Sequence, residues 1–172
     1  MDVFRGGLFK ALGHDHTIAA RRFSGTVQFD PRKLRDSSIS LSIESSSLTV
    51  LDPRVPEKER NEVQDTMQGP KVLDVRAFPK IEFSSTRVSE VAQTENGFEI
   101  TLTGRLNLHG FDKEIAFPVS ISLGKDLLHA TGSVSIIQTD FGIVPIKVGG
   151  GTVRVKDQVK IDFDFLAERA GP

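Results

Sequence analysis

The sequence contains no cysteine, no tryptophan and no tyrosine. Without cysteine the chain forms no disulfide, no thiolate metal site and no cysteine nucleophile. Its aromatic residues are 12 phenylalanines, whose rings carry no polar group and therefore suit an apolar interior with few hydrogen bonds. These absences exclude thiol chemistry and leave aliphatic and phenylalanine side chains to build the core.

The sequence also lacks a charge excess and a long hydrophobic run. Lys and Arg number 22 against 23 Asp and Glu, so the net charge of −1 gives no overall positive field to attract nucleic acid. No apolar run approaches the ~20 residues of a membrane-spanning helix. The first residues, MDVFRGGLFKALG, have no continuous apolar core, so we expect a cytoplasmic protein as written, or a periplasmic one if a leader was removed.

Polar and apolar residues alternate along most of the chain, which is the pattern of half-buried β-strands. The longest run covers residues 98–108, and residues 109–113 (HGFDK) form the expected turn to the next strand. With the N-terminal segment we predict about eight strands joined by short turns, an all-β antiparallel barrel or sandwich in a single domain, residues 1–172. The other predicted strands cover residues 23–29, 39–43, 81–88, 115–123, 128–136 and 159–165.

One charged segment, residues 55–73, interrupts this alternation. Pro56 is suited to open a helix and Gly69-Pro70 to end it, while Val63 and Met67, four residues apart, form a narrow apolar stripe. We expect this helix to dock weakly over one end of the barrel, as a lid. The alternative is an inert connection between strands.

Five segments occur along the chain in a fixed order: FSGTVQFDP, SISLSIESSSLTV, AFPKIEFSST, GRLNLHGFDKEIAFPV and FGIVPIKVGGGTVRVKDQVKI. In this order they resemble the YceI-like polyisoprenoid-binding proteins of bacteria. The resemblance implies an extended eight-stranded antiparallel barrel, similar to that of lipocalins, with a helix near a long apolar pore. It also implies that the pore binds isoprenoid chains or other amphiphiles, and that the protein forms a homodimer.

A barrel of about eight strands is either filled by its own side chains or holds one small ligand. Gly104, Ala130 and Gly132 fall on the inward face between larger residues, so we expect a channel to open there. An apolar chain would bind in it without polar contacts, because each buried CH₂ contributes about 0.8 kcal/mol. The candidate ligand contacts are Val63 and Met67 at the entrance and Phe83, Leu102, Leu106, Phe117, Ile136 and Phe163 in the wall.

Two other interpretations stay open. His14 and His16 flank Asp15 and have the spacing of a two-ligand zinc clamp, with His109 as a possible third ligand, which would make the chain a metal-binding protein or a metal-dependent hydrolase. A barrel with a filled core would instead act as a structural or stress-response partner of other proteins. No G-x-S-x-G or H-E-x-x-H motif is present, and His14 to His16 read best as the start of a strand.

We therefore predict a binding protein and not an enzyme, with no catalytic residue, no cofactor and no nucleic-acid partner. Its predicted ligand is a polyisoprenoid, an isoprenoid quinone or a fatty-acyl molecule, held for carriage, storage or sequestration.

Overall fold

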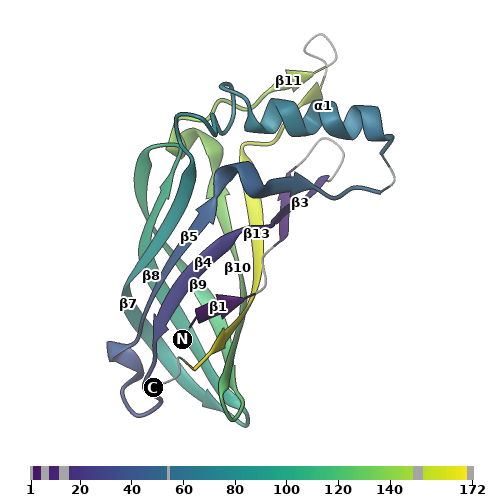
Figure 1. The fold of residues 1–172 in the computed structure, drawn as a ribbon. Coiled ribbons are helices and arrows are strands. Elements are labelled where there is room, and N and C mark those ends of the chain that lie inside the picture. Colours follow the sequence, from purple (N-terminus) through teal and green to yellow (C-terminus); the bar gives the residue numbers. More distant parts are fainter. Residues whose placement is uncertain (1, 5–7, 12–15, 54, 149–152, 170–172) are drawn as a thin grey trace.

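The computed structural model describes residues 2–4, 8–11, 16–53, 55–148 and 153–169. Antiparallel strands curl around an apolar interior, and the helix α1 and the β11–β12 hairpin lie at one end of this barrel (Figure 1). The helical elements are α1 (Glu57–Gln68) and the 3-10 turns η1 (Leu34–Asp36), η2 (Ser45–Ser47) and η3 (Gln138–Phe141). The strands are β1 (Asp2–Phe4), β2 (Leu8–Ala11), β3 (His16–Ala20), β4 (Phe23–Gln28), β5 (Ser38–Glu44), β6 (Leu48–Val50), β7 (Lys80–Thr94), β8 (Gly97–Leu108), β9 (Phe111–Leu123), β10 (Leu127–Ile137), β11 (Lys147–Val148), β12 (Val153–Arg154) and β13 (Gln158–Glu168).

The barrel is built from eight strand positions, three of which are occupied by two short strands each. β1 and β2 pair with β13 in the same register, β3 and β4 are separated at Arg21 and Arg22, and β5 and β6 are separated by η2. On one path β1 pairs with β4 and β4 with β5; on the other β2 pairs with β3 and β3 with β6. From β5 the pairing continues through β7, β8, β9 and β10 to β13, which pairs with both β1 and β2. The predicted all-β, lipocalin-like fold with one short helix is confirmed.

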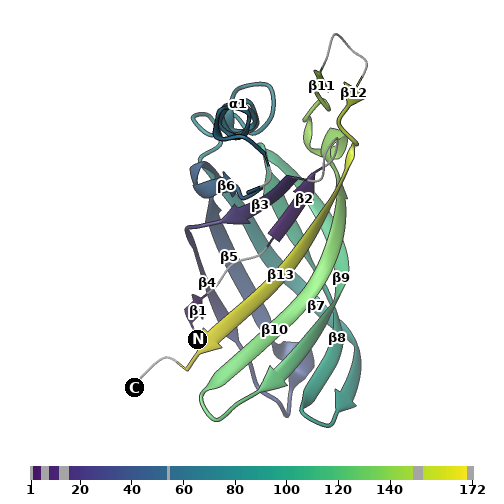
Figure 2. The same cartoon turned by 90° about the vertical axis from the view of Figure 1, so that its right-hand side faces the viewer.

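The long strands β7 to β10 and β13 form one side of the barrel, and Figure 2 shows β13, β10 and β9 running next to one another along its length. Two expectations about these strands were wrong. β7 continues to Thr94, six residues beyond its predicted end, because bulges after Ser85 and Ser89 interrupt the alternation. The turn before β9 is His109-Gly110 alone; both residues have positive φ, 53° and 77°, as a two-residue hairpin turn of type I′ requires.

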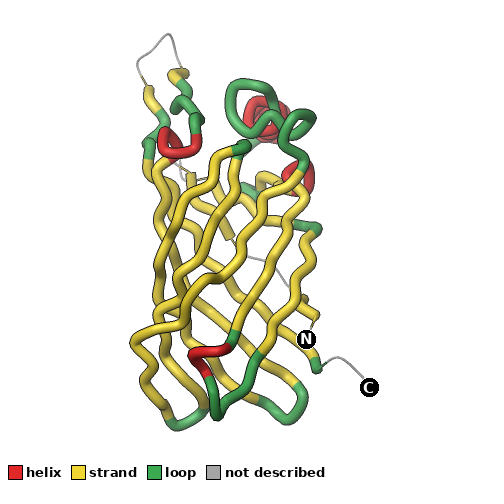
Figure 3. The backbone as a smooth tube through the Cα atoms, turned by 90° about the vertical axis from the view of Figure 1, so that its left-hand side faces the viewer, coloured by secondary structure: helices red, strands yellow, loops and turns green. Residues whose placement is uncertain are grey.

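The helix α1 has the predicted limits, since Pro56 precedes its first residue and Gly69 follows its last. Glu57 and Glu59 lie in its first turn, where carboxylates favour the positive end of the helix dipole. Figure 3 shows α1 together with η2 and η3 at one end of the barrel, whereas η1 lies at the opposite end. No helix in the described part of the chain is long and apolar enough to cross a membrane.

The two ends of the interior differ. Toward the η1 end, buried apolar side chains fill the space between the strands, and the phenyl rings of Phe29 and Phe98 pack with their centroids 6.4 Å apart. A cavity lies toward the α1 end. The buried side chains that fill the η1 end do not line the cavity, and they include Val88, Ile100, Ile121, Leu128 and Ala167.

Candidate functional site

The interior contains a cavity of about 230 Å³. Its wall comes from strands on every side of the barrel, and α1 and the segment that follows it complete the wall at one end. Gln138 is the one polar residue among the lining residues of the described chain; all others are aliphatic, phenylalanine or Met67. The cavity can therefore take an apolar chain, but it offers almost no partner to a polar ligand.

Seven of the eight predicted ligand contacts line this cavity, and their role as ligand contacts stays a prediction. Val63 is the exception: it is half-buried and packs against the core without lining the cavity, one helical turn before Met67. Met67 is only 9% exposed and is the residue of α1 that reaches the cavity. The seven are Met67, Phe83, Leu102, Leu106, Phe117, Ile136 and Phe163.

Five phenylalanines form a continuous row of rings across the cavity wall. The Phe117 ring lies between those of Phe83 and Phe163, with a centroid distance of 5.5 Å to each. The row continues from Phe163 to Phe165 at 5.6 Å and from Phe165 to Phe23 at 5.7 Å. It joins β7, β9, β13 and β4, which are distant in the sequence, and aromatic pairs at such separations stabilise one another beyond their burial.

The expected channel at Gly104 and Gly132 is absent. The ring of Phe83 occupies the space beside Gly104 on β8, and the ring of Phe163 occupies the space beside Gly132 on β10. Each glycine lies on a strand between two strands that carry phenylalanine, so the missing side chain lets rings from the flanking strands meet above it. Of the three small residues, Ala130 alone lines the cavity.

The helix α1 is attached to the barrel by side-chain hydrogen bonds, which the sequence pattern did not predict, and its weak docking as a lid stays a prediction. The side-chain oxygen of Gln64 accepts a bond from the Val50 N–H at 2.8 Å, and its Nε2 donates to the Leu48 carbonyl at 2.7 Å. Gln68 Nε2 donates to the carbonyls of Leu48 and Ser46. Among the described strands, β6 pairs with β3 on one side only, and these side-chain amides bond to the backbone groups on its other, unpaired edge.

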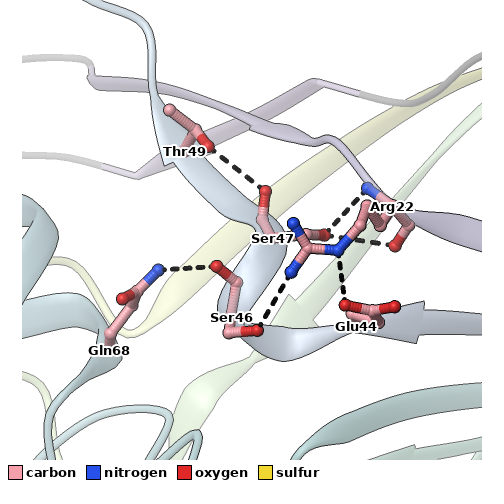
Figure 4. Close-up of polar contacts among 6 residues, drawn as sticks. All are labelled: Arg22, Glu44, Ser46, Ser47, Thr49 and Gln68. Carbon is pink, nitrogen blue, oxygen red and sulfur yellow. Dashed lines mark hydrogen bonds and ion pairs between the residues drawn. The ribbon is translucent and has the colours of Figure 1, made fainter.

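Gln68 thereby reaches a group of polar residues where β3 and β5 bend, here called the polar junction and consisting of Arg22, Glu44, Ser46 and Ser47 (Figure 4). The Ser47 hydroxyl accepts a bond from the Arg22 N–H and donates to the Arg22 carbonyl. Arg22 Nε donates to Glu44 Oε2 at 2.5 Å. The junction, together with Gln68, supplies side-chain partners for the Arg22 N–H and the Ser46 carbonyl where the strands are interrupted, so it fixes the part of the barrel on which α1 lies.

The proposed metal site is only partly within the described structure. His14 lies outside the described residues, and of His16 only the backbone is described, in β3. His109 Nδ1 lies 3.2 Å from the Phe141 carbonyl and its ring packs on Phe78, while His129 Nε2 lies 2.8 Å from an Asp164 carboxylate oxygen. The residues that are described contain no group of three side chains arranged to hold a metal ion.

Gln138 is the lining residue that sequence reasoning missed. It continues the inward series of β10, in which Val134 and Ile136 precede it at a spacing of two. A polar residue in this otherwise apolar inward series was the signal that could have identified Gln138 as a lining residue.

Far from the cavity, in the turn after β4, the pKa of Asp30 is lowered, chiefly because its carboxylate accepts a hydrogen bond from the Arg32 N–H at 2.9 Å.

A curled antiparallel sheet around an apolar cavity, with one helix across its end, defines a lipocalin-like barrel. The YceI-like domain family matches residues 8–167, so the chain belongs to that family. No curated protein sequence matches the chain.

Solved structures show the same fold. Burkholderia cenocepacia BcnA has a TM-score of 0.78 at 21% identity, over 94% of this chain and 95% of that one. A polyisoprenoid-binding domain from Saccharophagus degradans, implicated in plant cell wall breakdown, has a TM-score of 0.67 at 13% identity, over 98% and 94%. The Campylobacter jejuni YceI protein has a TM-score of 0.67 at 14% identity, over 90% and 85%.

Proposed function

We propose that this protein binds the apolar chain of a lipid, a polyisoprenoid, isoprenoid quinone or fatty-acyl molecule, inside the barrel, for carriage, storage or sequestration. The observation that carries the proposal is the cavity of about 230 Å³, whose described lining is apolar except for Gln138. The description of the Saccharophagus degradans domain as polyisoprenoid-binding supports the same ligand class.

The size of the cavity sets the length of chain that it accepts without rearrangement. An apolar cavity of about 150 Å³ holds one benzene molecule, so 230 Å³ accommodates roughly nine carbon atoms, close to two isoprene units. At about 0.8 kcal/mol per CH₂, their burial contributes about 7 kcal/mol before the cost of association. A longer chain requires the phenylalanine row or Met67 to move.

We infer binding and not catalysis from the chemistry of the lining. General acid–base and nucleophilic catalysis both need a titratable or nucleophilic side chain within reach of the bound molecule. The lining residues of the described chain include no carboxylate, histidine, lysine, serine or threonine. A molecule bound in the cavity contacts aliphatic side chains, phenyl rings, the Met67 thioether and the single amide of Gln138.

Mass spectrometry of an organic extract of the purified protein tests the proposal, with an unrelated protein purified in parallel as the control. We expect a prenyl or acyl molecule at near-stoichiometric amount. Delipidated protein should then bind geraniol, measured by displacement of an apolar fluorescent dye, because the chain has no Trp or Tyr to report binding. The proposal is wrong if the extract contains no such molecule and neither prenyl alcohols nor fatty acids displace the dye. The expected homodimer stays a prediction, which light scattering on the same sample checks.

A further inference from the structure

The one polar residue of the lining is placed to select the polar end of the ligand. We infer that the side-chain oxygen of Gln138 accepts a hydrogen bond from the bound molecule, so that the cavity prefers a chain with a neutral hydrogen-bond donor, such as a hydroxyl group, over one with an anionic end. This inference rests on the proposed function and adds to it the chemical class of the end group.

The two ends of the Gln138 amide have different surroundings. Its Nε2 donates to the Lys156 carbonyl at 2.8 Å, and because a carbonyl only accepts, this contact identifies the nitrogen and the oxygen of the amide. Among the described residues, no hydrogen bond reaches the amide oxygen. The bond to Lys156 therefore fixes the amide and leaves its oxygen without a hydrogen-bond partner among the described residues.

That oxygen belongs to a residue of the cavity wall. Gln138 is 9% exposed and lines the cavity. Among the described residues, the side-chain polar atoms that are fully covered and unpartnered are those of Ser37 and Thr103, and the Gln138 oxygen is not one of them. An acceptor on the cavity wall that has no hydrogen-bond partner among the described residues is available to a ligand, and it gains most from a ligand that donates a hydrogen bond.

The position of Gln138 agrees with the orientation of an amphiphile. Gln138 begins η3 at the α1 end of the barrel, whereas packed side chains fill the other end. An apolar chain thus extends from η3 toward the phenylalanine row, with its polar end beside the amide. The described lining contains no Lys, Arg or His, so a phosphate or carboxylate there would be buried without a counter-charge.

The test compares two ten-carbon ligands, geraniol and geranyl methyl ether, which differ in the hydroxyl hydrogen. Dye displacement gives the ratio of their affinities for the wild-type chain and for Gln138→Met, which keeps the length of the side chain but removes the acceptor. We expect the ratio, geraniol over ether, to fall about three- to tenfold in Gln138→Met, the usual effect of one hydrogen bond. A merely structural effect would weaken both ligands equally and leave the ratio unchanged. Leu108→Met, at another lining position, is the matched control and should keep the wild-type ratio.

The wild-type chain alone provides a second measurement if Gln138→Met does not fold. Geranyl phosphate should bind at least tenfold more weakly than geraniol. If both uncharged ligands bind but the ratio is unchanged in Gln138→Met, or if the phosphate binds as tightly as the alcohol, the inference is overturned while the proposed function stands. Failure of the wild-type chain to bind either uncharged ligand overturns both.

Discussion

The phenyl ring of Phe83 on β7 stands in the space that a side chain at Gly104 on β8 would occupy. From this position it meets Phe117 on β9, although β7 and β9 are not neighbours in the sheet. The same arrangement recurs with Phe163 beside Gly132. Glycine is thus needed at these positions for the packing of rings inside the barrel.

Gly104→Ala tests this relationship. A Cβ at Gly104 would collide with the Phe83 ring and would lie 2.6 Å from the Ser84 carbonyl oxygen, so a ring or a strand must shift. We expect the free energy of unfolding to fall by about 1–3 kcal/mol, the usual cost of an overpacked core. Urea denaturation followed by circular dichroism measures it. The matched control is Gly124→Ala, where a Cβ meets nothing closer than 3.6 Å and where the loss of unfolded-state entropy leaves stability unchanged or raised by up to ~1 kcal/mol. Equal effects of the two substitutions would contradict the packing argument.

Phe117→Ala should change the length of chain that the cavity accepts. Its ring is the centre of the row, and its removal extends the cavity at a stability cost of about 3–5 kcal/mol. We expect the preference for farnesol over geraniol to rise about tenfold, because two additional buried CH₂ groups alone contribute about 1.6 kcal/mol. Dye displacement gives both affinities. Phe29→Ala removes a ring that does not line the cavity and should leave the preference as it is; a similar rise in that variant would disprove the role of the row.

Met67→Glu should weaken ligand binding, because it places a charge on the buried residue through which α1 reaches the cavity. We expect a loss of at least about 1 kcal/mol, or roughly fivefold in affinity, with little change in the β-sheet circular dichroism. Asn61→Glu adds the same charge to an exposed position of α1 and should have no effect.

Hydrogen exchange over residues 55–73, with and without geraniol, separates a lid from a fixed cover. A lid gains protection when the ligand binds. The bonds of Gln64 and Gln68 to β6 predict that any opening pivots at that edge, so the start of α1 should exchange faster than its last turn. Unchanged protection together with unchanged affinity of Met67→Glu would show that the segment is an ordinary connection.

The double substitution of His14 and His16 by Asn tests the metal interpretation. We expect the affinity for geraniol to stay within a few-fold of the wild-type value, because burial of the chain supplies most of the binding energy. Elemental analysis of both proteins gives their zinc content. Stoichiometric zinc in the wild-type chain that is lost in the double variant would establish a metal site.

The sequence by itself determined the elements that local patterning controls. Alternation located β8, β10 and β13 to within a few residues, because the side chains of a strand point to opposite faces in turn. Pro56 and Gly69 set the limits of α1, because each acts on the backbone beside it. The same alternation identified six residues of the cavity wall, and the four-residue spacing of Val63 and Met67 identified the seventh, Met67.

Tertiary structure decided what fills the barrel. Whether Gly104 leaves a channel or shelters a ring depends on the register between β7, β8 and β9, and Phe23 and Phe165 meet only because the strands curl into a barrel. The attachment of α1 by Gln64 and Gln68 depends on an edge of β6 that exists only after β5 has bent at η2. These contacts join residues far apart in the chain, and their geometry follows from pairing and side-chain packing in three dimensions, which the order of residues along one strand does not contain.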